Sequence, residues 1–497
     1  MAEEEGIVKK YRKKYEKQEA TFALFTPFFV SVGAGNLDLQ SFDHCISQDF
    51  YFLQALLQAF RMAEDWADRE AYKEPIRSLK EFVHKMIRTY KTTVLENPKV
   101  SGIDSTTDNY LDFLVSTASG KFEGDYIREK RNTIAAYTLA AIAPFMRLYV
   151  HLSHRILQDL NNTSDNIYKK WLQYYCSQEI QDLAKETEDA LDKLGASLTK
   201  EELPFAEKLY HQAMKLQVQF FASLSVSQPT VVPYNSVQDL NKSPLAIFSN
   251  VNLTCIVFQD RSSVKCLKTE LFDITTEYGR ELKHYLESVM ASHPAISQFD
   301  YNGFSIALEQ VEELKRKRNE KMEDSLVMKD LSLDMIQTAI PELRLFDNCR
   351  EFFQKTVTIA KFPRIDLHVV SHFHYGDFIR KLFPSDQLDY TKDSVTTGKI
   401  IKAGSPFDKF HVFPEVQKVY IGGKVEDLLS LVQADIGIVL GSSKILWKLG
   451  EHFGISFVPL LNGVVKNQMG LGDWKPKSGI LYTVDSWAEI QAFILGL

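Results

Sequence analysis

The 497-residue sequence has no apolar run long enough to cross a membrane and no surplus of positive charge. A membrane span needs about eighteen or more apolar residues in succession, and nucleic-acid-binding domains usually carry a basic face. A net charge of −7 and a pI near 6.0 therefore predict a water-soluble protein that binds neither nucleic acid nor membrane. The basic run at residues 9–17 is the exception, and we interpret it as the solvated side of a first helix.

Cysteine is scarce, with five residues and no metal-type spacing. An odd number without such spacing favours free thiols in a reducing compartment. The start Met-Ala-Glu-Glu-Glu-Gly is acidic, and it has neither the apolar core of a secretory signal nor the composition of an organelle transit peptide. We therefore expect a cytoplasmic location.

The chain also lacks internal repeats, but its hydrophobic period changes near residue 235. At this length two domains are expected. Residues 1–226 have apolar side chains at three-and-four spacing, which predicts an all-α helical bundle, with Ser41 as the N-cap of one helix. Residues 227–244, which begin with two prolines among turn formers, are predicted to be a linker.

Residues 245–497 contain short apolar runs between helical stretches, a pattern typical of a parallel sheet with crossover helices. Six strands are expected, at residues 245–249, 367–371, 416–421, 436–440, 456–460 and 480–484. A helical insert at about residues 265–355 is too long for a simple crossover. We interpret it as a cap over the carboxyl edge of the sheet, where such folds bind their ligands.

The first expected strand ends in Ser249-Asn-Val-Asn-Leu-Thr254, with asparagine at 250 and 252. This turn resembles the Asp-x-Asp-x-Thr motif of haloacid-dehalogenase (HAD) phosphatases. In that family the first aspartate attacks phosphorus and the second transfers the proton of the leaving group. Neither Asn250 nor Asn252 carries the carboxylate that this chemistry requires.

Three further positions extend the HAD resemblance. Ser371 stands where the family has a phosphate-binding hydroxyl, and Lys409 matches the lysine that balances the phosphate charge. In the family's Gly-Asp-x-x-x-Asp element the first aspartate holds Mg²⁺, and that position is Gly423 here. Asp427 remains, and the resemblance suggests it as the metal ligand that is left. The resemblance implies Mg²⁺ as cofactor, and the missing carboxylates imply that its site is weakened or lost.

The first half resembles the TenA family of pyrimidine hydrolases, which have a haem-oxygenase-like helical fold. Asp49 and Phe52, in Ser47-Gln-Asp-Phe-Tyr-Phe52, lie in a segment like the one whose aspartate binds the aminopyrimidine. Tyr110 and Tyr149 match the tyrosines of the family's pocket. The alternative for Asp49 is a buried carboxylate bonded to a neighbouring tyrosine. Cys45, one helical turn before Asp49, either approaches this pocket or is a small buried hydrophobe.

The catalytic groups of the TenA family are replaced as well. Phe145, in Ala143-Pro-Phe145, stands where the family has its cysteine nucleophile. Gln217, in Lys215-Leu-Gln217-Val-Gln-Phe-Phe221, stands where the family has its acid/base glutamate. What survives is an aromatic pocket with one carboxylate, which is typical of a binding site.

A TenA module followed by a HAD module resembles plant fusions that release thiamine from its monophosphate and salvage pyrimidine breakdown products. The resemblance implies two domains, an all-α TenA-like bundle and an α/β HAD-like Rossmannoid domain with a helical cap. It also implies a small heterocycle or a phosphate ester as ligand, and homo-oligomers formed through the helical module.

Because both modules have lost their nucleophiles, we interpret the chain as a ligand-binding or regulatory pseudoenzyme of this family. The alternative is an enzyme: a thiamine monophosphate phosphatase, an aminopyrimidine aminohydrolase or a repurposed TenA-type enzyme.

Overall fold

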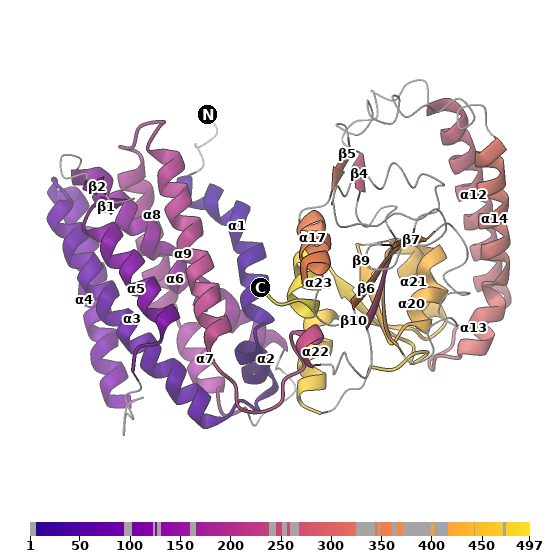
Figure 1. Ribbon diagram of the computed structural model, residues 1–497, viewed down its shortest axis with the longest axis horizontal. Coiled ribbons are helices and arrows are strands. Elements are labelled where there is room, and N and C mark those ends of the chain that lie inside the picture. Colours follow the sequence, from indigo (N-terminus) through magenta and orange to yellow (C-terminus); the bar gives the residue numbers. More distant parts are fainter. Residues whose placement is uncertain are drawn as a thin grey trace. The chain divides into compact units, whose positions relative to one another are not determined.

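The computed structural model (Figure 1) describes residues 6–93, 102–122, 125–126, 131–159, 166–237, 245–250, 256–258, 268–324, 343–345, 348–359, 365–370, 399–401, 416–441, 443–470 and 474–497. The chain forms two compact units, one of Met1–Pro233 with Gly496–Leu497 and the other of Tyr234–Leu495. The division lies between Pro233 and Tyr234, inside the segment expected as a linker.

The first unit is helical, as the apolar spacing predicts. Its helices are α1 (Ile7–Leu24), α2 (Pro27–Ala34), α3 (Leu39–Trp66), α4 (Glu70–Thr93), α5 (Ser105–Ala118), α6 (Arg131–Asp159), α7 (Lys169–Tyr175), α8 (Gln178–Gly195) and α9 (Leu203–Ser223). A short antiparallel pair, β1 (Lys121–Phe122) and β2 (Asp125–Tyr126), follows α5.

Helix α6 lies among the other helices of this unit and packs against α3, α5, α7, α8 and α9 (Figure 1). Among the described residues, its stretch Arg131–Gln158 is the one helix apolar and long enough to cross a membrane, with a mean hydropathy of 1.4. Its most apolar window is 89% buried inside the unit, so its composition matches that of a core helix.

Asp38, not Ser41, caps helix α3. The Asp38 carboxylate accepts hydrogen bonds from the Ser41 backbone N–H at 2.8 Å, the Ser41 hydroxyl at 2.5 Å and the Ser227 backbone N–H at 3.3 Å. Partial burial raises the pKa of Asp38, but these bonds outweigh it and lower the pKa to about 2. The cap therefore also joins the beginning of the expected linker to the first unit.

Asp38→Ala will destabilise the first unit by about 1 kcal/mol near neutral pH, because the first turn of α3 loses its side-chain cap. The pKa of Asp38 is lower in the folded than in the unfolded protein, where it is about 3.9. The contribution is therefore present above that value and is lost as the pH falls toward 2. Urea unfolding near pH 7 and at about pH 3 measures it. Asp43→Ala, at an exposed position of α3, is the control. An equal loss in both variants, or a loss independent of pH, would contradict this role of Asp38.

The second unit is built on a seven-stranded sheet in the order β10-β11-β9-β8-β3-β6-β7. Every pairing in it is parallel. The six expected strands are observed with ends shifted by at most two residues, and the short edge strand β7 was not predicted. The strands are β3 (Leu245–Asn250), β6 (Ile365–Val370), β7 (Lys399–Ile401), β8 (Gln417–Gly422), β9 (Ile436–Leu440), β10 (Ser456–Pro459) and β11 (Ile480–Val484).

Helices and one small sheet surround these strands. The helices are α10 (Tyr234–Val237), α12 (Lys268–Ser292), α13 (Tyr301–Ala307), α14 (Glu309–Asp324), α17 (Cys349–Ile359), the 3₁₀ turn η2 (Val425–Asp427), α20 (Leu428–Gln433), α21 (Lys444–His452), α22 (Leu460–Gln468) and α23 (Trp487–Ile494). Strands β4 (Ile256–Phe258) and β5 (Leu343–Leu345) form an antiparallel pair.

The described part of the insert shares a core with the sheet and its helices, and the expected cap over the carboxyl edge stays a prediction. Leu286 of α12 shares one core with Leu428 of α20 and Leu449 of α21, and Figure 1 shows these helices together. The insert reaches the carboxyl edge at η2. There the Tyr278 hydroxyl donates to Glu426 at 3.0 Å, and the Arg318 guanidinium lies 4.6 Å from the centre of the Tyr278 ring.

Candidate functional sites

Four helices of the first unit bring six expected site residues into one buried cluster. Pairs spaced three or four residues apart lie on one face of a helix, as Asp49 and Phe52 do in α3 and Phe145 and Tyr149 do in α6. No member is more than 3% exposed. The members are Asp49, Phe52, Tyr110, Phe145, Tyr149 and Gln217.

Two hydrogen bonds cross this cluster between helices. The Tyr149 hydroxyl donates to Asp49 Oδ1 at 2.6 Å, and the Tyr110 hydroxyl donates to Gln217 Oε1 at 3.1 Å. Burial raises the pKa of Tyr110 far above its ordinary range, so its hydroxyl remains a donor. Asp49 is thus a buried carboxylate bonded to a tyrosine, as one of the two sequence interpretations described it.

Aromatic rings fill the space between these polar pairs. The Phe52 ring stacks on Phe145 with centroids 4.1 Å apart and lies 4.5 Å from Tyr110. Phe145 in turn meets the edge of Tyr149 at 5.3 Å. At position 145, where the resemblance to the TenA family suggested the nucleophile, this chain has a packed hydrocarbon ring.

Sequence reasoning missed two aromatic neighbours of the cluster. Tyr175 stacks on Tyr149 at 4.3 Å, and Trp171 lies one turn before it on α7, 6.2 Å from Tyr149. The four-residue spacing of Trp171 and Tyr175 indicates a shared helix face. The spacing does not indicate which residues that face contacts, because this depends on how α7 packs against the other helices.

Two buried donors of this region lack a partner among the residues that the structure describes. They are Gln217 Nε2 and Trp171 Nε1. Buried polar groups in folded proteins are nearly always hydrogen-bonded. Each of these groups is therefore a buried donor that lacks an acceptor in the described part of the protein.

Cys45 lies one turn before Asp49 and is fully buried. Burial and, secondarily, the charge of Asp49 raise the pKa of its thiol well above the usual value. Because the thiolate is the nucleophilic form, burial makes Cys45 a weak nucleophile.

The second cluster lies at the carboxyl edge of the parallel sheet. Asn250 ends β3, and Asp427 lies in η2, which follows the neighbouring strand β8. Asn250 Nδ2 donates to Asp427 Oδ1 at 2.7 Å, and both side chains are buried. Asn252, Ser371 and Lys409, the other expected residues of this site, lie outside the described residues.

Three more donors surround the Asp427 carboxylate. The Tyr420 hydroxyl donates to Oδ1 at 3.0 Å, while the backbone N–H groups of Gly423 and Lys424 donate to Oδ2 at 2.9 and 3.0 Å. Burial raises the pKa of Asp427, and the bonds from Asn250 and Gly423 offset only part of that rise. The sequence did not predict Tyr420 as a partner.

These residues do not fit a Mg²⁺ ion. Magnesium prefers carboxylate oxygens and water in near-octahedral geometry. The family carboxylates are Asn250 and Gly423 here, and the four hydrogen bonds use the acceptor positions of Asp427. In the described ranges no three His, Cys, Asp or Glu side chains gather as metal ligands. Asp427, suggested above as a remaining metal ligand, instead anchors its loop.

Comparisons with known proteins found relatives of the whole chain and of part of it. The chain is 37% identical to "Bifunctional TH2 protein, mitochondrial" of Arabidopsis thaliana over an alignment 560 positions long, gaps included. The alignment covers 99% of this chain and 90% of that protein. It is 23% identical over 204 residues to the aminopyrimidine aminohydrolase of Staphylococcus carnosus, covering 35% of this chain and 86% of that enzyme. No family model matches the chain.

Among solved structures, a TenA homologue from Pyrococcus furiosus is 16% identical and covers 43% of this chain and 98% of its own, with a TM-score of 0.37. The identity to the Arabidopsis protein extends over nearly the whole of both chains and thus includes both units. This chain therefore belongs to the family of bifunctional TH2 proteins, the plant TenA/HAD fusions that its motifs resemble.

Proposed function

We propose that this chain is a ligand-binding member of its family that catalyses neither family reaction. In this proposal the first unit keeps a TenA-type site for a small heterocycle, and the second is a HAD-like domain without phosphatase chemistry. Gln217 carries the proposal. Its Oε1 accepts from Tyr110, while its Nε2 is buried with no partner in the described part of the chain, which leaves this NH₂ group for a ligand.

The unpaired groups indicate the kind of ligand. Gln217 Nε2 and Trp171 Nε1 are both donors, so the ligand should present acceptors such as ring nitrogens or carbonyl oxygens. The rings of Phe52 and Phe145 suit a flat, partly apolar molecule. An aminopyrimidine meets these requirements, and the relative from Staphylococcus carnosus is named for acting on one.

The side chains of the first cluster support binding rather than hydrolysis. Phe145 has no nucleophilic atom, and the amide of Gln217 does not exchange a proton as a glutamate does. Loss of a covalent nucleophile generally lowers the rate by several orders of magnitude. These residues can hold and orient a ring, but they supply no group that attacks it.

The second unit has lost its chemistry in the same way. Asn250 stands where the nucleophilic aspartate would attack phosphorus, and its amide already donates to Asp427. We propose that this unit does not release phosphate from thiamine monophosphate, and that the protein keeps a binding or regulatory part in thiamine metabolism. A cytoplasmic location and homo-oligomers formed by the helical unit stay predictions. The name of the Arabidopsis relative places that protein in mitochondria.

Thermal unfolding and product analysis on the same samples test this proposal. Full-length protein is heated with 4-amino-5-aminomethyl-2-methylpyrimidine or with thiamine monophosphate and Mg²⁺. We expect the aminopyrimidine to raise the melting temperature of the first unit in a concentration-dependent manner. We expect neither hydrolysed pyrimidine nor phosphate above the level in buffer.

Two α9 variants link the expected stabilisation to the site. Gln217→Leu removes the unpaired donor and should abolish most of the ligand-induced shift. Gln212→Leu, at an exposed position of the same helix, should leave that shift unchanged. Turnover at the rate of ordinary family enzymes would refute the proposal. So would a ligand shift that Gln217→Leu leaves intact.

A further inference from the structure

The hydrogen bond between Asn250 and Asp427 joins two neighbouring strands at their carboxyl ends. It is 2.7 Å long, and Asn250 and Asp427 are 0% and 1% exposed. An ionised carboxylate only accepts hydrogen bonds, so the nitrogen of the Asn250 amide is the atom that faces it. Residue 250 therefore contributes a donor at a point where the family has a second carboxylate.

Asp427 also binds the loop after β8. Its Oδ2 accepts from the N–H groups of Gly423 and Lys424, and its Oδ1 also accepts from Tyr420 of β8. The carboxylate lies so close to the strand end that a β-carbon on Gly422 would be 2.7 Å from it. One side chain thus holds the end of β3, strand β8 and the turn into η2 together.

An aspartate at position 250 would reverse this interaction. Two carboxylates at hydrogen-bond distance in a buried site repel each other unless a cation or a shared proton lies between them. A divalent cation serves that purpose where both carboxylates are present. The Asn250 amide is attracted to the Asp427 carboxylate without any ion, because its N–H group donates a hydrogen bond to it.

We propose that the Asn250 amide replaces a divalent cation as the link between β3 and the η2 loop. The substitution that removed the nucleophile thereby makes the carboxyl edge of this sheet independent of metal. This inference concerns what holds the edge together and involves no reaction, so it goes beyond the proposed function and can fail independently of it.

Hydrogen exchange of the full-length protein tests the inference, with mass spectrometry of the peptides that contain Gly423 and Lys424. Wild-type protein should show the same protection of these amides in EDTA and in Mg²⁺. In Asn250→Asp they should exchange about tenfold faster, or more, in EDTA, because the buried pair is now repulsive. Addition of Mg²⁺ should restore protection in this variant.

Two further variants distinguish the effect of the amide donor on amide protection from the effect of the metal. Asn250→Ala removes the amide without adding a carboxylate, so its amides should exchange fast both in EDTA and in Mg²⁺. The double variant Asn250→Asp/Asp427→Asn places the donor on the other side and should recover protection in EDTA.

Wild-type protection that increases with Mg²⁺ would overturn the inference. This comparison needs no variant and holds even if Asn250→Asp does not fold. The inference would also be overturned if the amides of Gly423 and Lys424 were as well protected as in the wild type in Asn250→Asp with EDTA. The same result in Asn250→Ala, in either condition, would overturn it too. Phosphate release is not part of the readout, so failure of the proposed function is detected separately.

Discussion

Asp427→Ala will destabilise the second unit by about 3–4 kcal/mol. The carboxylate accepts four hydrogen bonds inside the protein, and alanine accepts none. The buried Asn250 amide and Tyr420 hydroxyl would each lose a charged acceptor, and a hydrogen bond to a charged group contributes about 1.5–3 kcal/mol. The loss is therefore larger than that of one surface bond, and the turn into η2 loosens with it.

Urea unfolding followed by tryptophan fluorescence measures this effect. The matched control is Asp435→Ala in the same unit. Asp435 is only partly buried, and its Oδ2 accepts from the backbone N–H of Lys418 at 2.8 Å. We expect the control to cost about 1 kcal/mol. Equal losses at the two positions would show that Asp427 is not the anchor of the edge.

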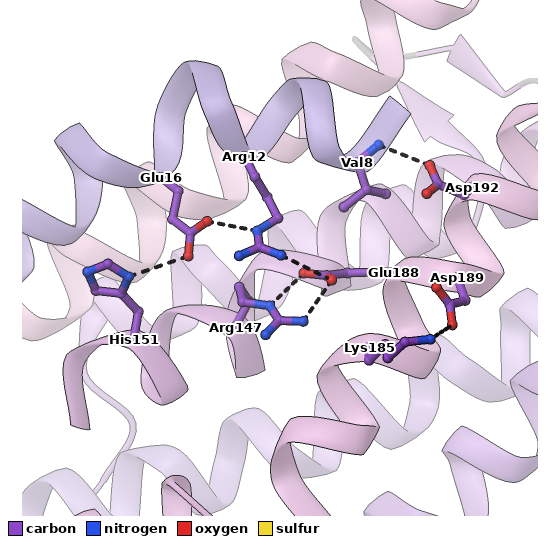
Figure 2. A network of polar contacts seen from close by, with 9 residues as sticks. All are labelled: Val8, Arg12, Glu16, Arg147, His151, Lys185, Glu188, Asp189 and Asp192. Carbon is purple, nitrogen blue, oxygen red and sulfur yellow. Dashed lines mark hydrogen bonds and ion pairs between the residues drawn. The ribbon is translucent and has the colours of Figure 1, made fainter. Parts of the chain in front are cut away.

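Glu188→Ala will destabilise the first unit by about 3 kcal/mol, because it leaves the Arg147 guanidinium without its carboxylate. Glu188 accepts from Nε and Nη2 of Arg147, each at 2.7 Å, and lies 3.5 Å from Arg12 Nη1. The side chains of Arg147 and Glu188 are 17% and 10% exposed, so solvent screens their attraction only in part. Figure 2 shows this network, which connects α1, α6 and α8.

A neighbouring carboxylate provides the control. Asp189 pairs with Lys185 at 2.5 Å, but both side chains are more than half exposed (Figure 2). Asp189→Ala should therefore cost about 0.5 kcal/mol or less. The double variant Glu188→Leu/Arg147→Met should recover much of the loss, since it removes both charges. Urea unfolding compares the variants, and equal losses from Glu188→Ala and Asp189→Ala would contradict the argument.

The same network makes the first unit sensitive to acid through Glu16. Burial alone would raise the pKa of Glu16, but its bonds with His151 and Arg12 outweigh burial and hold the pKa below its usual value. A carboxyl group whose pKa is lower in the folded state stabilises the protein above its unfolded pKa. That contribution is lost as the pH falls through the folded pKa. The Glu188→Ala measurement is therefore made near neutral pH, where Glu16 is ionised.

The strands of the second unit and the helical nature of the first could be predicted because each depends on local spacing of apolar side chains. Contacts between distant elements could not. Ser41 has the chemistry of an N-cap, yet Asp38 caps α3, because the chain turns into the helix three residues earlier. Tyr420 reads as an ordinary strand residue, and only its packing brings its hydroxyl to Asp427.

Residue identity alone decided that Phe145 offers no nucleophilic atom and that Asn250 offers no carboxylate, because these properties of a phenyl ring and an amide hold in any fold. Only the folded chain decided what those side chains do instead. Phe145 packs against Phe52 from another helix, and Asn250 donates to Asp427, which lies 177 residues away along the chain. Such pairings depend on how helices and strands meet in space, and no local pattern along the chain encodes that.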